Sequence, residues 1–90
     1  MDEVKAKPIE EQINDSDDVK ELILFNDEVN TFEHVIQCLV EVCRHTTEQA
    51  EQCALIAHFK GKCPVKSGSF TELKPMADEL TRRYLTVEIQ

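Results

Sequence analysis

The residues best suited to chemistry in this sequence are Asn26, Asp27 and Glu28, which place an amide and two acids side by side. They follow a short apolar run and precede a helix-start signal, so we expect them in a turn between a strand and a helix. Their side-chain oxygens are acceptors suited to an ammonium group, which has three donors and no acceptor. A second interpretation stays open, in which they form a solvated turn capped by an Asp or Asn side chain.

Further residues gain a role if the second expected helix passes this turn. Phe32, together with Ala54 and Ala57 of that helix, would line an apolar pocket beside the acceptors. His58, near the end of the helix, is a binding candidate on the same condition and is otherwise a packing or capping residue. The pocket would suit a ligand with one cationic end and one apolar side chain.

The sequence offers little for catalysis. His34, His45 and His58 are the candidate bases, but the chain has only two glycines and no phosphate-binding glycine loop. It also lacks the Gly-x-Ser-x-Gly and His-Glu-x-x-His motifs. Cys53 and His58 are five residues apart, which is off the i, i+4 register of a helix face. A small cysteine-dependent enzyme therefore remains only as an alternative.

The four cysteines fit neither a zinc site nor a disulfide framework. Cys38, Cys43, Cys53 and Cys63 are separated by five, ten and ten residues, and none forms a Cys-x-x-Cys pair. We expect buried free thiols, which pack as small hydrophobes, and we expect no metal or other cofactor.

Composition sets the domain organisation and the class of partner. Residues 1–18 are rich in acids and poor in apolar residues, which predicts a disordered tail followed by one folded domain over residues 19–90. The net charge of −8 argues against nucleic-acid binding. No apolar stretch is long enough for a membrane span or resembles a signal peptide, so we expect a cytoplasmic protein without membrane contact.

The expected element order is β-α-α-β-α-β, an α+β fold with three helices on a small three-stranded sheet. Strands are predicted over residues 20–26, 62–66 and 86–89, the second as an edge strand or extended segment because it contains Pro64. Residues 67–69 are expected to form a turn.

Capping signals place the three helices between those strands. The first is expected over residues 31–44, with Asn30 as its N-cap. A Thr46–Gln49 capping box and a C-cap at Gly61 bound the second. A Ser69–Glu72 box starts the third, whose first turn is expected to be irregular, or whose regular part is expected to begin at Pro75.

Three stretches together are similar to one family. LILFNDEVNTFEHVIQCL, then ALIAHFKGKC, then the closing LTVEI resemble the ClpS adaptors of the Clp protease, over about residues 20–90. The resemblance implies a non-catalytic adaptor that binds proteins whose free N-terminal residue is large and apolar, an N-degron. It also implies delivery to a ClpA- or ClpC-like AAA+ unfoldase, which the N-terminal tail enters.

The same resemblance implies two sets of substrate-binding residues. The substrate's α-amino group would be held by Asn26, Asp27, Glu28 and His58. Its side chain would enter a pocket lined by Phe32, Val35, Ala54, Ala57 and Leu85. The alternative is a non-enzymatic regulatory module of the same fold that docks on an unfoldase or a ribosome without reading N-termini.

Overall fold

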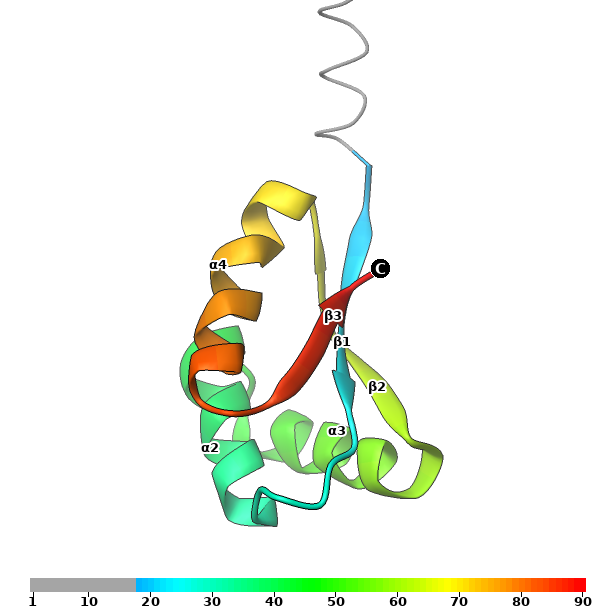
Figure 1. Ribbon diagram of the computed structural model, residues 1–90, viewed down its shortest axis with the longest axis vertical. Coiled ribbons are helices and arrows are strands. Elements are labelled where there is room, and N and C mark those ends of the chain that lie inside the picture. The colour runs from blue at the N-terminus through cyan, green and yellow to red at the C-terminus, as the bar shows by residue number, and fades with distance from the viewer. Residues whose placement is uncertain (1–17) are drawn as a thin grey trace, which may run out of the picture.

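The computed structural model of the protein describes residues 18–90. Residues 1–17 of the expected disordered tail lie outside the described residues. The elements follow the order β-α-α-β-α-β, which confirms the predicted α+β architecture (Figure 1). They are β1 (Lys20–Phe25), α2 (Phe32–Cys43), α3 (Thr47–Lys60), β2 (Lys62–Gly68), α4 (Phe70–Arg82) and β3 (Thr86–Ile89).

The strands form one antiparallel sheet in the order β2-β1-β3. β1 is therefore the central strand, and its run of apolar residues suits a strand that is buried. Leu22 and Leu24 alternate with Ile23 along β1 and are almost completely buried in the core shared with the helices. This strand fixes the position at which the chain leaves the sheet after Phe25.

β2 is an edge strand, as Pro64 requires. Pro64 lies opposite Ile23, at the point where the register between the two strands shifts. A bulge beside proline is expected, because proline has no N–H to donate to the ladder. The predicted turn at residues 67–69 is wrong in part: Ser67 and Gly68 extend the strand, since Glu21 and Lys20 of β1 lie opposite them and continue the pairing.

The structure confirms both predicted boundaries of α3. Thr46 and Gln49 form a reciprocal capping box at its start. Gly61 ends the helix with a φ of 95°, a left-handed conformation that glycine adopts without a Cβ penalty. Its N–H donates to the carbonyl oxygen of Ala57. The C-cap thus sets where α3 turns into β2, directly beside the end of β1.

The predicted N-cap of α2 is wrong by one residue. The Thr31 hydroxyl, and not the Asn30 side chain, accepts the hydrogen bond from the backbone N–H of His34, at 3.0 Å. Asn30 instead donates hydrogen bonds from Nδ2 to Asp27 and to the carbonyl oxygen of Tyr84, which fixes the orientation of its side chain. Its tertiary partners therefore outweigh its local capping preference.

α4 begins earlier and more regularly than Pro75 suggests. Ser69 and Glu72 form the predicted capping box, and the helix is continuous from Phe70 with Pro75 inside it. Proline removes one backbone hydrogen bond there. The capping box satisfies the first turn, and Leu73, Ala77 and Leu80 bury one face of the helix, so the loss is tolerated.

The core lies between the sheet and the helices. α2 and α4 pack against each other, while α3 contacts α2 and β2, and α4 contacts β3 (Figure 1). Cys38, Cys43 and Cys63 are buried in this core and Cys53 is half-buried; all four are free thiols, as predicted. Among residues 18–90, no helix is long and apolar enough to cross a membrane.

Candidate functional site

A pocket of about 500 Å³ opens where the loop after β1 faces the second half of α3. Its lining comes from the end of β1, the loop of residues 26–31, the first turn of α2 and the last turns of α3. All of the predicted site residues except Leu85 line it. The lining residues are Leu24, Phe25, Asn26, Asp27, Glu28, Asn30, Phe32, Val35, Ala54, Leu55, Ala57, His58 and Phe59.

One backbone hydrogen bond brings the two halves of the pocket together. The N–H of Asn26 donates to the carbonyl oxygen of Gly61 at 2.9 Å, so the loop after β1 is tied to the C-terminal end of α3. His58 lies one turn before that end. The acidic turn and the helix histidine, 32 positions apart in sequence, therefore line one pocket.

Asp27 shapes the turn rather than presenting a free carboxylate. Its Oδ1 accepts from the backbone N–H groups of Val29 and Asn30 at 2.9 and 3.0 Å, and its Oδ2 accepts from the Asn30 amide at 2.9 Å. Partial burial opposes ionisation of this carboxyl, but the three hydrogen bonds outweigh it, so its pKa is lowered. For Asp27, the alternative of a capping turn is therefore correct, and it coexists with a place in the pocket.

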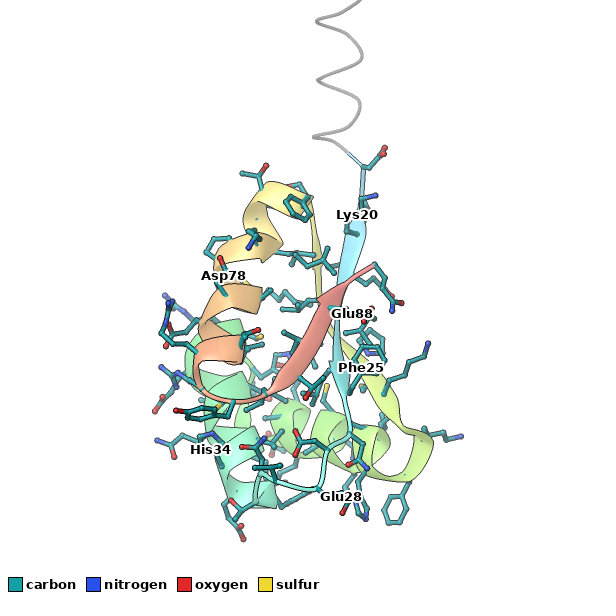
Figure 2. All side chains as sticks on the ribbon, in the orientation of Figure 1. Lys20, Phe25, Glu28, His34, Asp78 and Glu88 are labelled. Atoms are coloured by element: carbon teal, nitrogen blue, oxygen red, sulfur yellow. The ribbon has the colours of Figure 1, made fainter. Side chains whose placement is uncertain are left out.

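Asn26, Glu28 and His58 are the polar lining residues whose whole side chains remain available. Their side chains are exposed and have no hydrogen-bond partner within residues 18–90. The ring of His58 packs edge to face against that of Phe59, with the two ring centroids 4.9 Å apart. Figure 2 shows Glu28 on the loop after β1, beside α3. None of the described residues that line the pocket is a lysine or arginine, so its field favours a cation.

The apolar wall lies beside these acceptors. Ala54 and Ala57 are 5% and 3% exposed and have small side chains, which keeps the face of α3 open. Phe32 and Leu55 are about 40% exposed and border the pocket from α2 and α3. The arrangement can hold a ligand that combines a cationic group with an apolar side chain.

Leu85 is placed elsewhere. It is 3% exposed and belongs to the core cluster. It follows Tyr84, whose carbonyl oxygen accepts from Asn30 of the pocket at 2.8 Å. Leu85 therefore packs behind the site and does not line the pocket.

Sequence reasoning missed Leu24, Phe25, Asn30, Leu55 and Phe59 as lining residues. A signal for Asn30 was present. An Asp followed three positions later by Asn is typical of a turn in which the carboxylate accepts from nearby backbone and amide groups. Leu55 and Phe59 carry no such local signal, because their side chains reach the pocket only through the placement of α3.

The structure brings one cysteine and one histidine together, but not the pair that the sequence suggested. His34 Nε2 lies 3.4 Å from the sulfur of Cys38 and 2.9 Å from the carbonyl oxygen of Arg83. Burial raises the pKa of the Cys38 thiol, and its side chain is 1% exposed. A protonated, enclosed thiol is a poor nucleophile, so the contact between His34 and Cys38 is one of packing within α2. The hydrogen bond between His34 and Arg83 links that helix to the end of α4.

Within residues 18–90, no three His, Cys, Asp or Glu side chains are grouped to hold a metal ion. A family described as "ATP-dependent Clp protease adaptor protein ClpS" matches residues 15–87. The chain belongs to the ClpS family.

One solved structure similar to this ClpS-family chain is that of ClpS2 from Agrobacterium tumefaciens, described as bound to L-phenylalaninamide. The two share 22% sequence identity and superimpose with a TM-score of 0.68, over 80% of this chain and 94% of the other. At this identity the likeness shows that the fold is shared. No curated protein sequence matched the chain.

Proposed function

We propose that this ClpS-family protein is a non-catalytic adaptor that binds proteins bearing a free, large apolar N-terminal residue. The observation that supports this most directly is the pairing of free acceptors with an apolar wall. The side chains of Asn26, Glu28 and His58 have no hydrogen-bond partner within residues 18–90, and these residues line the same pocket as the buried Ala54 and Ala57.

An N-terminal residue matches both parts of the pocket. Its α-ammonium group has a pKa near 8 and is largely charged at neutral pH. Asn26 Oδ1, the Glu28 carboxylate and an imidazole nitrogen of His58 can each accept one of its three hydrogens. Asp27 adds negative charge and holds the turn. The first side chain then lies against Phe32 and Val35 of α2 and against the alanines of α3.

The relative of known structure supports the same ligand chemistry. L-phenylalaninamide, described as bound to the Agrobacterium protein, has a free α-amino group and one large apolar side chain. Its carboxyl group is blocked as an amide, so it imitates the first residue of a peptide. We extend this ligand class to the present chain, with leucine, phenylalanine, tyrosine and tryptophan as the N-terminal residues.

Delivery completes the proposal. The adaptor hands its substrate to a ClpA- or ClpC-like AAA+ unfoldase in the cytoplasm, and residues 1–18 engage the unfoldase while residues 19–90 form the binding domain. All described residues that line the pocket fall between Leu24 and Phe59. The residues proposed to bind the substrate are therefore separate in sequence from the segment proposed for delivery.

Titration calorimetry with two peptides tests the binding step. One peptide begins with a free phenylalanine, and its twin has the same sequence with an acetylated N-terminus. Acetylation removes the charge and two of the three donors, which leaves desolvated acceptors unpaired. We expect binding of the free peptide and at least a hundredfold weaker binding of the acetylated one. Equal affinities, or no binding of either, would instead favour a regulatory module of the same fold.

A further inference from the structure

Asn30 holds an unusual place in the pocket. It is half-buried and lines the pocket together with the apolar residues Val35 and Ala57. Its Nδ2 atom donates two hydrogen bonds, to Asp27 Oδ2 at 2.9 Å and to the carbonyl oxygen of Tyr84 at 2.8 Å. One side chain thus ties the acidic turn to the segment that leads into β3.

These two bonds fix the orientation of the Asn30 amide. Both partners are oxygens that can only accept, so exchanging the amide nitrogen and oxygen would place Oδ1 against a carboxylate and a carbonyl group. Both N–H donors of Nδ2 are consumed. Oδ1 has no partner within residues 18–90, so an acceptor is what Asn30 can offer to an occupant of the pocket.

The apolar surroundings of Asn30 Oδ1 allow this acceptor to distinguish between substrate side chains. The part of the pocket proposed for the substrate's first side chain is lined by apolar side chains that carry no polar atom, those of Phe32, Val35, Ala54 and Ala57. An occupant that covers an acceptor without bonding to it leaves the acceptor desolvated and unpaired, at a cost in affinity. An occupant that carries a donor avoids that cost. The small alanine side chains leave room for a bulky ring to reach this wall.

We propose that Asn30 is a specificity-determining residue, whose Oδ1 accepts a hydrogen bond from the first side chain of the substrate. The favoured substrates begin with tyrosine, through its phenolic O–H, or with tryptophan, through its indole N–H. Phenylalanine and leucine offer no such donor. This inference rests on the proposed function and narrows its substrate class to donor-bearing aromatic N-termini.

Calorimetry with peptides that differ only at residue one tests the inference. Tyrosine and phenylalanine differ by a single oxygen atom, and we expect the tyrosine peptide to bind roughly fivefold more tightly. Tryptophan and naphthylalanine form a second pair, in which only the former has an N–H, and the same direction is expected. These comparisons use the wild-type protein and do not depend on the folding of any variant.

The variant Asn30→Ala tests whether the preference for tyrosine over phenylalanine comes from this residue. The variant also releases Asp27 and Tyr84, and a loosened turn weakens tyrosine and phenylalanine peptides alike. The ratio of their affinities cancels that shared effect, and we expect it to fall to about one. Tighter binding of phenylalanine by the wild type, or a tyrosine preference unchanged in Asn30→Ala, overturns the role of Asn30 and leaves N-terminal recognition standing. Failure of all four free peptides to bind overturns the proposed function as well.

Discussion

The backbone N–H of Asn26 donates to the carbonyl oxygen of Gly61 at 2.9 Å, and this bond holds the acidic turn against the end of α3. Asn26 directly follows β1 and Gly61 caps α3, so the bond joins the ends of two separate elements. Together they bring two separate stretches of chain into one pocket. The geometry of binding therefore depends on Gly61, a helix cap that makes no proposed ligand contact of its own.

Replacing Gly61 should lower stability through the backbone. Its φ of 95° disfavours any residue with a Cβ, although a Cβ built there meets no atom within 4 Å. We expect Gly61→Ala to reduce the free energy of unfolding by about 1 kcal/mol, measured by urea denaturation. Gly61→Asn is the matched control and should lose less, because asparagine tolerates the left-handed region. An alanine variant as stable as the wild type would contradict this account of the C-cap.

Glu28 should contribute charge to ligand binding. It is exposed and has no partner among the described residues, so Glu28→Gln removes a charge without breaking a contact within residues 18–90. We expect about tenfold weaker binding of a peptide with a free N-terminal phenylalanine, and a smaller dependence of affinity on salt. Glu51→Gln, an exposed change on α3 outside the pocket, controls for net charge and should leave affinity nearly unchanged. Equal effects of the two variants would reduce Glu28 to a general electrostatic role.

Asp27 should make part of the stability depend on pH. Because its pKa is lowered in the folded state, the unfolded state binds more protons at acidic pH. Its contribution is present above the unfolded pKa, near 3.9, and is lost as the pH falls through the lower folded value. We expect Asp27→Asn to be less stable than the wild type at pH 7, by about 1 kcal/mol, and the gap to narrow below about pH 4. Denaturation curves from pH 7 to pH 3 measure this difference in the free energy of unfolding. A difference that stays constant with pH would contradict the role of Asp27.

The thiols should be slow to react in the folded protein. Burial raises the pKa of Cys43 to about 11 and, with a smaller effect from Cys53, that of Cys63 to about 12. Iodoacetamide at pH 8, followed by mass spectrometry, should modify the half-buried Cys53 first and all four cysteines only in denaturant. Rapid modification of Cys38, Cys43 or Cys63 in the native protein would revive the cysteine-enzyme alternative.

Removing residues 1–18 should separate binding from delivery. Every described residue that lines the pocket lies beyond this segment, so we expect unchanged peptide affinity and much slower degradation of an N-degron substrate by a Clp unfoldase and its protease. A variant with residues 1–18 in scrambled order keeps length and charge, and tests whether delivery depends on the sequence of the segment. Loss of affinity on deletion would show that the tail belongs to the binding site.

The sequence by itself determined the elements and most of their ends. The apolar run of β1, the capping boxes of α3 and α4 and the glycine after α3 act over a few residues, so their effects can be predicted locally. Asn26, Asp27 and Glu28 were recognisable as a polar turn for the same reason. Local signals failed at Asn30, because its amide bonds to Tyr84, 54 positions away.

The structure decided between the two interpretations of the polar turn and showed how its residues divide their roles. It assigned Asp27 to the turn and left Asn26, Glu28 and His58 unpartnered within residues 18–90, a distinction that residue types cannot make because each could accept a hydrogen bond. It also placed Leu85 in the core and Phe59 at the pocket, since the packing of α3 and β3 against the sheet sets which side chains reach it. For Leu85 and Phe59, packing between distant segments carries that information, and no local pattern records it.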